Sequence, residues 1–224
     1  MHIGLIGGIG PAATDFYHRG LIERHHAAGR PLDLTIAYAD VREMSRNMAN
    51  KNPSRQAETF ARLVGRLKAA GAEIAAVTSM GGHFCVRELE AISPLPILNG
   101  IPEVKAALVR RKHKRLGIIG TRTVMESQLY GGIPSIEIVA PEGDAMEEVH
   151  SAYAEMAGSG HVTDRHRQVF FRAGRALCRE RGAEAVLLGG TDLFLAFTGE
   201  APGFPVIDCA DLHIDAIFAK STGG

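Results

Sequence analysis

The chain has 224 residues, and its 25 Lys and Arg residues balance its 25 Asp and Glu residues, so the formal net charge is zero. This balance argues against nucleic acid or an anionic membrane as a partner. No apolar stretch reaches the roughly 20 residues needed to cross a bilayer. The three cysteines, Cys85, Cys178 and Cys209, form no CxxC pair or disulfide framework. We therefore expect a reduced, cytoplasmic protein.

The first part of the sequence predicts strands that alternate with helices. A strand at residues 3–7 leads through a glycine turn into a helix over roughly 12–28, and a second strand follows at 32–39. Residues 40–53 are polar and form a connection longer than most, which predicts a lid or a binding loop. Ser54 is expected to cap the next helix.

The same alternation continues to the C-terminus. A strand at 74–78 ends in a glycine-rich turn, a buried strand begins again at Leu116, and a long amphipathic helix covers about 164–181. The last helix, from Ala210 onward, is expected to pack back on the first lobe. This regular alternation predicts an α/β fold in which parallel sheets carry helices on both faces.

An internal repeat divides the chain. Three segments recur in the same order at offsets of 113, 111 and 109 residues: 3–8 at 116–121, 71–77 at 182–188, and 96–99 at 205–208. Repeats of this length are whole lobes. We therefore expect two pseudo-symmetric lobes, residues 1–98 with 209–224 and residues 99–208. A ligand cleft is expected between the lobes, at the carboxyl ends of both sets of strands.

Ser79 and Gly190 are equivalent by this repeat, because 79 plus the offset of 111 gives 190 and each follows a buried strand. The helix N-termini and glycine turns beside them offer backbone N–H groups that suit a carboxylate. The ligand is expected to meet further residues of the same turns: Gly8, Ile9, Gly10, Met80, Gly81, His83, Thr121, Thr123, Thr191 and Asp192.

Five segments of the chain, in this order, form a set of motifs: Gly7-Gly8-Ile9-Gly10-Pro11, Ser79-Met80-Gly81-Gly82-His83, residues 120–126 with Tyr130, Gly189-Gly190-Thr191-Asp192-Leu193, and Asp208 with His213. Together they resemble motifs of the aspartate/glutamate racemase superfamily over essentially the whole chain. The resemblance implies a small amino acid or dicarboxylate as ligand and no pyridoxal phosphate, other cofactor or metal. It also admits a homodimer.

The resemblance further implies two thiols, at positions 79 and 190, that remove and return the α-proton from opposite faces of the substrate. Ser79 carries a hydroxyl instead, which needs an adjacent base to act, and Gly190 has no side chain. Racemisation through paired thiols is therefore excluded. The sequence predicts an isomerase-like protein, or a related lyase, with altered chemistry on a small carboxylate: isomerisation, elimination or decarboxylation.

Besides Ser79, two ionisable residues are candidates for catalysis. His83 is either a general base near neutral pH or a residue that orients its turn by hydrogen bonds. Asp192 caps a helix, binds a substrate amine or transfers a proton. Cys85 lies two positions along the helix from His83, so we expect it to be a buried structural thiol.

The 40–53 segment is expected to supply a contact to a substrate carboxylate. Arg46 is the candidate cation, whereas Met48 is the residue that aligns with the family's contact. Arg122 either holds an anion or is an ordinary surface residue. No cluster has metal-ligand spacing, since the nearest pair, His25 and His26, are adjacent and point apart on a helix.

Two other classes of function remain open. Gly8-x-Gly10-x-x-Ala13 satisfies a dinucleotide-binding fingerprint with Asp40 as the ribose ligand, although Pro11 removes a donor that a pyrophosphate would want. The other alternative is a catalytically silent protein that binds an amino acid or dicarboxylate, which the absence of both thiols favours.

Overall fold

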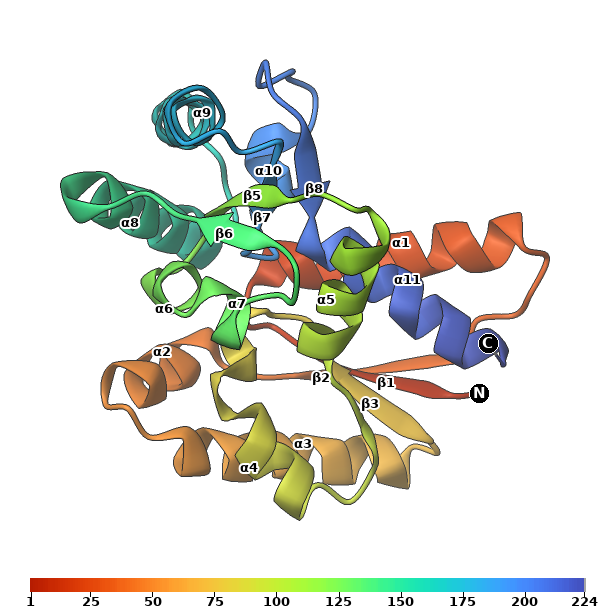
Figure 1. Cartoon of the computed structure of the whole chain (residues 1–224). Coiled ribbons are helices and arrows are strands. Elements are labelled where there is room, and N and C mark those ends of the chain that lie inside the picture. Colours follow the sequence, from red (N-terminus) through yellow and green to blue (C-terminus); the bar gives the residue numbers. More distant parts are fainter. Residues whose placement is uncertain (224) are drawn as a thin grey trace. The chain divides into compact units, whose positions relative to one another are not determined.

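The computed structural model describes residues 1–223 and has the α/β fold that the sequence predicts (Figure 1). Two four-stranded sheets have the orders β2-β1-β3-β4 and β6-β5-β7-β8, which are equivalent under the internal repeat. Every strand pair is parallel, so the carboxyl ends of all four strands meet at one edge of each sheet. The strands are β1 (Ile3–Gly7), β2 (Leu34–Tyr38), β3 (Ile74–Val77), β4 (Ile97–Leu98), β5 (Arg115–Ile119), β6 (Glu137–Val139), β7 (Ala185–Leu188) and β8 (Val206–Asp208).

The chain forms two compact units. Unit 1 comprises Met1–Gly100 and the C-terminal segment from His213, and unit 2 comprises Ile101–Leu212. The borders fall inside α5 (Gly100–Arg110) and α11 (Cys209–Thr222), whereas the repeat places them at 98/99 and 208/209. Each of these two helices follows the last strand of one sheet and continues into the other unit.

In unit 1, helix α3 (Pro53–Ala69) covers one face of the sheet. Its side chains Phe60, Leu63, Val64 and Leu67 recur at helical spacing and are buried in one core with residues of β1 and β3. Helices α2 (Val41–Ala49) and α4 (Val86–Ile92) pack against α3. A short 3₁₀ helix, η1 (Gly81–Cys85), precedes α4.

The opposite face of this sheet carries α1 (Pro11–Ala27) and the unit 1 part of α11 (Figure 1). The two helices approach closely at Gly20, where a Cβ atom would lie 3.0 Å from Cδ1 of Ile214. Farther along, His25 Nε2 lies 2.9 Å from the Ser221 hydroxyl. The C-terminal helix thus packs on the first lobe, as expected.

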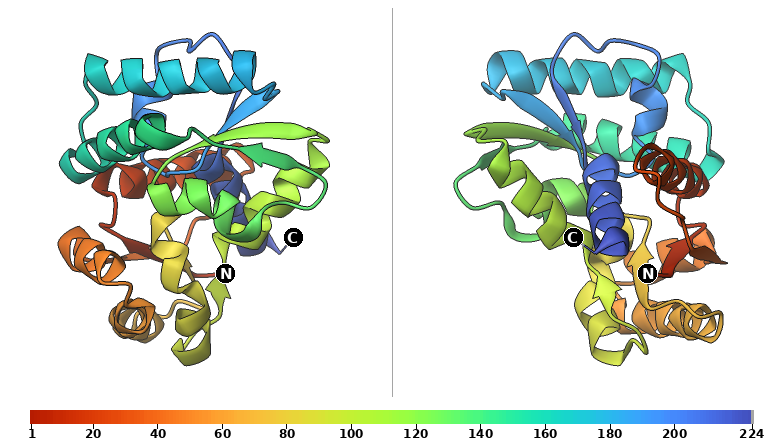
Figure 2. Two further views of the ribbon diagram at one scale, coloured as in Figure 1. Left: turned by 60° about the vertical axis from the view of Figure 1, so that its left-hand side comes forward. Right: turned by 90° about the vertical axis from the view of Figure 1, so that its right-hand side faces the viewer.

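In unit 2, helix α9 (Asp164–Glu180) packs on β5 and β7, and α8 (Gly143–Ser159) lies beside it (Figure 2). Thr163 and His166 form a capping box at the start of α9. The shorter helices are α6 (Arg122–Glu126), α7 (Gln128–Gly131) and α10 (Phe194–Phe197). In α7, Gln128, Leu129 and Tyr130 all have positive φ, so this turn is left-handed.

Two sequence-based expectations for the 40–53 segment are wrong. The segment is not a loop, because Val41–Ala49 forms α2, which Asp40 caps and Met44 anchors to the core. Ser54 does not cap α3. Asn52 does, with Pro53 at the first helical position, where a missing N–H costs nothing.

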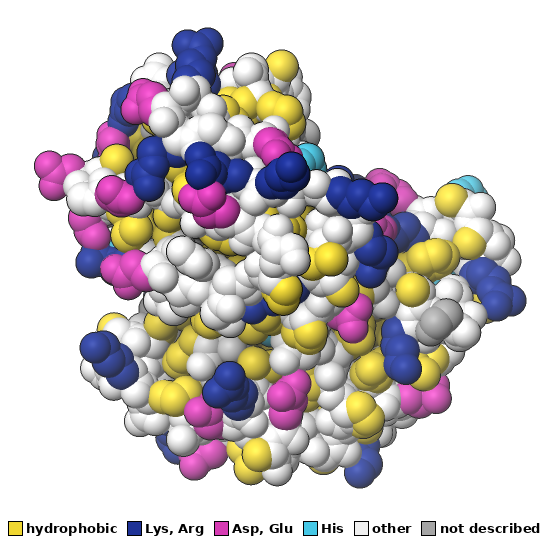
Figure 3. Space-filling model, viewed as in Figure 1, with side chains coloured by type: hydrophobic (Ala, Val, Ile, Leu, Met, Phe, Trp, Pro, Cys, Tyr) yellow, Lys and Arg dark blue, Asp and Glu magenta, His cyan; other side chains and the backbone are white. Residues whose placement is uncertain are grey.

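The surface carries charges of both signs, which are interspersed over the face shown in Figure 3. Several form exposed ion pairs, such as Arg115 with Glu137 and Arg181 with Glu142. Such pairs contribute about 0–1 kcal/mol each, so packing of the two cores stabilises the fold more than charge does. Within residues 1–223, no helix has both the length and the apolar character that crossing a membrane demands.

We predict that Lys112→Gly raises the free energy of unfolding by about 0.5–1 kcal/mol. Lys112 is exposed, follows α5 and has a φ of 61°, a left-handed conformation that disfavours a Cβ atom. Urea unfolding checks this through the midpoint at unchanged slope. Lys112→Ala is the control, because it removes the charge but keeps the strain; an equal gain in both variants would contradict the strain argument.

Candidate functional site

The turn after β1 lies at the carboxyl edge of the unit 1 sheet. Gly8 has a φ of 84°, and a Cβ atom there would lie 2.4 Å from the Ala39 carbonyl oxygen, so only glycine fits. Thr14 holds the turn, since its hydroxyl accepts the Gly8 N–H at 2.8 Å and donates to the Gly10 carbonyl at 3.1 Å. The Gly8 amide is therefore committed, which leaves the amides of Ile9 and Gly10 as candidates for a carboxylate.

Ser79 follows the end of β3 and is 4% exposed. Its hydroxyl oxygen accepts the Gly82 N–H at 3.2 Å. The preceding Thr78 donates its hydroxyl to the Ile6 carbonyl at 3.0 Å, which ties this turn to β1. Ile9 also packs against Gly82, where a Cβ atom would lie 3.2 Å from the Ile9 Cδ1. The structure thus brings the predicted residues of the two turns together at one edge.

His83 connects the Ser79 turn to the start of α5. Its Nδ1 lies 2.7 Å from the Ser79 carbonyl oxygen, and its Nε2 lies 3.0 Å from the Gly100 amide nitrogen. A carbonyl only accepts and an amide only donates, so Nδ1 carries the proton and Nε2 accepts. Burial lowers the pKa of His83 to about 4, so the ring is neutral near pH 7. Because both nitrogens are engaged, the geometry favours the orienting role over that of a general base.

A second buried histidine packs against His83. The rings of His83 and His213 have their centroids 5.8 Å apart, and His213 Nδ1 lies 2.9 Å from the Tyr17 hydroxyl. Burial lowers the pKa of His213 to about 3. A Cβ atom on Gly100 would lie 2.9 Å from the His213 ring, so this glycine permits the close packing. The cluster supports the Ser79 turn and is uncharged near neutral pH.

In unit 2, the turns after β5 and β7 are in contact. A Cβ atom on Gly120 would lie 3.2 Å from the Gly190 amide nitrogen. Thr121 caps α6 by accepting the Val124 N–H at 3.3 Å, and Thr123 lies half-buried in the first turn of that helix. The predicted residues of these two turns therefore share the carboxyl edge of the second sheet.

An aromatic ring fills the space next to Gly190. A Cβ atom at position 190 would lie 2.3 Å from Cε2 of Tyr153, 2.6 Å from Cζ and 2.8 Å from the hydroxyl oxygen. Tyr153 belongs to α8 and is 6% exposed. Position 190 cannot carry a side chain while this ring keeps its place.

Asp192 follows this turn and is 1% exposed. Its Oδ2 accepts the Tyr153 hydroxyl at 3.3 Å. The Leu195 N–H donates to the Asp192 carbonyl at 3.1 Å, so Asp192 lies in the turn that leads into α10. The interpretations of its carboxylate as a helix cap, an amine ligand or a proton-transfer group stay predictions. Thr191 is fully buried, and its hydroxyl oxygen has no hydrogen-bond partner within residues 1–223.

The thiols are poorly placed for thiolate chemistry. Burial raises the pKa of Cys85 to about 12 and raises that of Cys209 well above its usual value. Burial also raises the pKa of Cys178. Cys85 is buried, as expected, and Cys209 is buried as well. In the part of the chain that the structure describes, no three His, Cys, Asp or Glu side chains could hold a metal ion.

Arg46 and Met48 lie on α2, with Arg46 exposed and Met48 half-buried. Arg46 forms no ion pair among the described residues, whereas Arg122 is paired with Glu147. The carboxylate of Asp40 accepts a backbone N–H in the first turn of α2 at 2.7 Å. Because Asp40 serves as this cap, the dinucleotide interpretation loses its ribose ligand.

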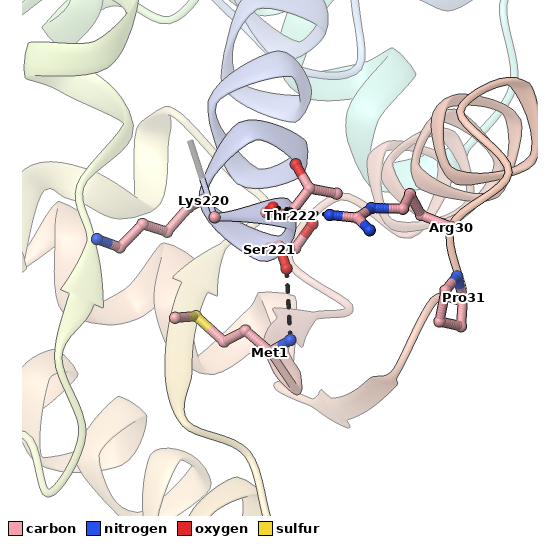
Figure 4. Close-up of a pocket in the computed structure, with 7 residues that line it drawn as sticks. Met1, Arg30, Pro31, Lys220, Ser221 and Thr222 are labelled. Atoms are coloured by element: carbon pink, nitrogen blue, oxygen red, sulfur yellow. Dashed lines mark hydrogen bonds between the residues drawn. The ribbon is translucent and has the colours of Figure 1, made fainter.

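A surface pocket at the C-terminal end of α11 is a different feature (Figure 4). There Arg30 donates to the Thr222 carbonyl and the Met1 amine to the Ser221 carbonyl, both at 3.3 Å. Cations at the last carbonyls of a helix stabilise it. None of the predicted site residues lines the pocket, whose walls are Met1, Arg30, Pro31, Lys220, Ser221, Thr222 and Gly223.

Residues 6–217 match the family model described as Asp/Glu/Hydantoin racemase. The chain belongs to this family. The glycine turn after β1 is one of the segments that resemble this family's motifs, so dinucleotide binding is not needed to account for its glycines.

Solved structures of racemases and their homologues share the fold. A Yersinia pestis protein assigned as an Asp/Glu racemase has a TM-score of 0.82 at 24% identity, covering 99% of this chain and 100% of that one. An aspartate racemase homologue from Pyrococcus horikoshii OT3 has a TM-score of 0.78 at 22% identity, covering 99% of both chains. Glutamate racemase from Francisella tularensis, solved with D-glutamate, has a TM-score of 0.68 at 14% identity, covering 99% and 81%. Such likenesses establish the two-sheet fold of this racemase-family chain.

The sequence analysis did not identify Tyr153, whose ring leaves no room for a side chain at position 190 after β7. Tyr153 lies far from Gly190 along the chain, and its spacing on α8 indicates only a buried helix face. Asp208 was noted only as part of a motif, although burial raises its pKa to about 7. The hydrogen bonds of Thr14 to the glycine turn were not predicted either.

We predict that Gly190→Ala lowers the free energy of unfolding by about 1–3 kcal/mol, because the new methyl group would meet the Tyr153 ring. Urea unfolding gives the change. Gly158→Ala is the matched control: it lies on the same helix as Tyr153, and a Cβ atom there has nothing within 4 Å. In a Tyr153→Ala background, the added cost of Gly190→Ala should disappear; an equal cost in both backgrounds would show that the ring is not the obstacle.

We predict that His83→Gln makes stability less sensitive to acid. The pKa of His83 is lowered from 6.5 to about 4 in the folded state, so its contribution is complete above pH 6.5 and is lost as the pH falls towards 4. The free energy of unfolding, measured between pH 7 and 4, should therefore fall less steeply in the variant than in the wild type. His26→Gln, at an exposed histidine, is the control. An unchanged slope in His83→Gln would contradict the buried neutral ring.

Proposed function

We propose that this racemase-family protein binds a small amino acid or dicarboxylate at the carboxyl ends of its strands. We further propose that it acts on this ligand as an isomerase-type enzyme, with no cofactor and no paired thiols. Family membership over residues 6–217 supports the substrate class, and one protein of the same fold was solved with D-glutamate. The observation that carries the proposal is Asp192, a buried carboxylate beside Gly190 at the end of β7.

The proposed ligand contacts follow from the chemistry of the two edges. In unit 1, the amides of Ile9 and Gly10 suit a carboxylate, because the neighbouring Gly8 amide is committed to Thr14. Arg46 is proposed as a cation for a carboxylate, since it has no ion pair among residues 1–223. In unit 2, Asp192 is proposed to bind the amine. The other proposed contacts are main-chain or hydroxyl groups of Met48, Met80, Gly81, Thr121, Thr123, Gly190 and Thr191.

The proposed chemistry differs from two-thiol proton exchange. Ser79 has its oxygen hydrogen-bonded to the Gly82 N–H, and the imidazole of His83 faces the Ser79 carbonyl rather than its hydroxyl. Ser79 is therefore proposed to donate a hydrogen bond to the ligand and not to act as a base. Asp192 is the ionisable side chain proposed to take up or deliver a proton.

A catalytically silent binding protein is the second candidate. One observation favours it: the ring nitrogens of His83, the nearest base to Ser79 along the chain, are both engaged by backbone groups. Under this candidate, the strand-end groups would hold the same ligand without any bond being broken.

We predict that the wild type exchanges the α-protons of aspartate and glutamate in deuterated water no faster than a heat-denatured control. NMR measures the exchange, and rapid exchange would contradict the exclusion of two-base chemistry. In parallel, thermal unfolding with a panel of D- and L-amino acids and dicarboxylates should reveal stabilising ligands. Saturation at about 100 times Kd adds about 2.7 kcal/mol to stability.

The panel also separates the two candidates. Conversion of a stabilising ligand into a new product, followed by NMR, supports an enzyme, whereas stabilisation without conversion supports a silent binder. If no member of the panel stabilises the protein, the proposed ligand class is wrong.

A further inference from the structure

Tyr153 of helix α8 places its hydroxyl group beside Gly190, the residue after β7 that has no side chain. The Tyr153 oxygen lies 2.8 Å from the place of a Cβ atom on Gly190, and the ring carbons next to it lie closer still. A side chain at position 190 would therefore begin where the end of Tyr153 now stands. In this fold the phenol occupies the volume that the strand-end residue leaves vacant.

The Tyr153 hydroxyl is held by Asp192. It donates to the Asp192 Oδ2 at 3.3 Å, and the Asp192 backbone N–H also interacts with its oxygen. Burial and the Asp192 charge raise the pKa of Tyr153 well above its usual value, so the phenol keeps its proton at neutral pH. A phenylalanine would fill the same space without burying a hydroxyl, which costs free energy unless it is hydrogen-bonded.

The surroundings of this pair accept hydrogen bonds and carry negative charge. The buried hydroxyl oxygen of Thr191, between Gly190 and Asp192, has no partner within residues 1–223. Asp208 is close enough for the Asp192 charge to help raise its pKa, after the larger effect of burial. The Asp208 carboxylate accepts the Ala210 N–H at 2.8 Å and forms no ion pair with a Lys or Arg among the described residues. Such a group of oxygens is suited to a ligand that brings a cation.

We propose that Tyr153 and Asp192 together form the ammonium-binding pair of unit 2, and that they select amino acids over dicarboxylates without an amine. The Asp192 carboxylate supplies the negative charge, and the hydrogen bond from Tyr153 holds this carboxylate in place. The hydroxyl oxygens of Tyr153 and Thr191 accept N–H groups of the ammonium. This proposal rests on the proposed function, which it narrows to α-amino acids. The hydroxyl of Tyr153 takes part in binding the ammonium, and its ring fills the space that a side chain at position 190 would need.

Calorimetry with two matched ligand pairs tests the proposal: aspartate against succinate, and glutamate against glutarate. Each pair differs only in the amine. The wild type should bind the amino acid more tightly, and Tyr153→Phe should reduce that preference by about tenfold or more while keeping the ring and the fold. Ser151→Ala, which removes an exposed hydroxyl from the same helix, is the control and should keep the wild-type preference.

Asp192→Asn is the second variant, which keeps the shape of the side chain and should lose the preference as well. The double variant should lose little more than either single one, because the two side chains act as a unit. The proposal is overturned if succinate binds as tightly as aspartate, or if both single variants keep the wild-type preference; ligand binding itself would still support the proposed function. If neither member of any pair binds, the proposed function is wrong and the selectivity proposal falls with it.

Discussion

Close packing at the carboxyl edge of each sheet is the constraint on which the rest of this structure depends. The turn after β1 passes so near the Ala39 carbonyl that position 8 must be glycine, and the turn after β7 meets the Tyr153 ring at position 190. Where the backbone is this crowded, the turns contribute amides rather than side chains. Chemical groups must then reach the edge from neighbouring elements, as Thr14 does from α1 and Tyr153 does from α8.

The two units solve this constraint with different chemistry, although their strand orders are equivalent. In unit 1, the turn after β3 is held by a neutral imidazole that joins the Ser79 carbonyl to the Gly100 amide. In unit 2, the turn after β7 is held by a phenol and a carboxylate, with the carboxyl of Asp208 close by. The turns after β1 and β3 therefore present amides and hydroxyls without charge, and the turn after β7 presents acidic oxygens. The two units thus repeat the strand order but differ in the charge of the groups at their strand ends.

The sequence predicted the parts of the fold that depend on local patterns. Buried apolar runs of neighbouring residues indicated strands, and the repeat predicted two similar α/β lobes with parallel sheets. The structure shows in addition that the two sheets have equivalent strand orders. The prediction for segment 40–53 was wrong although Val41, Met44 and Met48 recur at helical spacing in α2, because the segment was interpreted as one long polar connection and Asp40 as a ligand rather than a cap. Asn52 before Pro53 was a cap signal that the sequence contained, and Ser54 was chosen in its place.

The site was predicted less completely than the fold, for a physical reason. The sequence identifies which residues end a strand, but it cannot tell what a distant helix places against them. The resemblance to racemases describes position 190 as a lost thiol, which suggests an empty place. Tyr153 occupies that place, so a thiol at Gly190 would need room that the ring already takes. The absent side chain and the hydroxyl from α8 are thus one structural feature. Our proposals for this edge therefore rest on the phenol of Tyr153 and the carboxylate of Asp192, which are present, and not on a thiol at position 190.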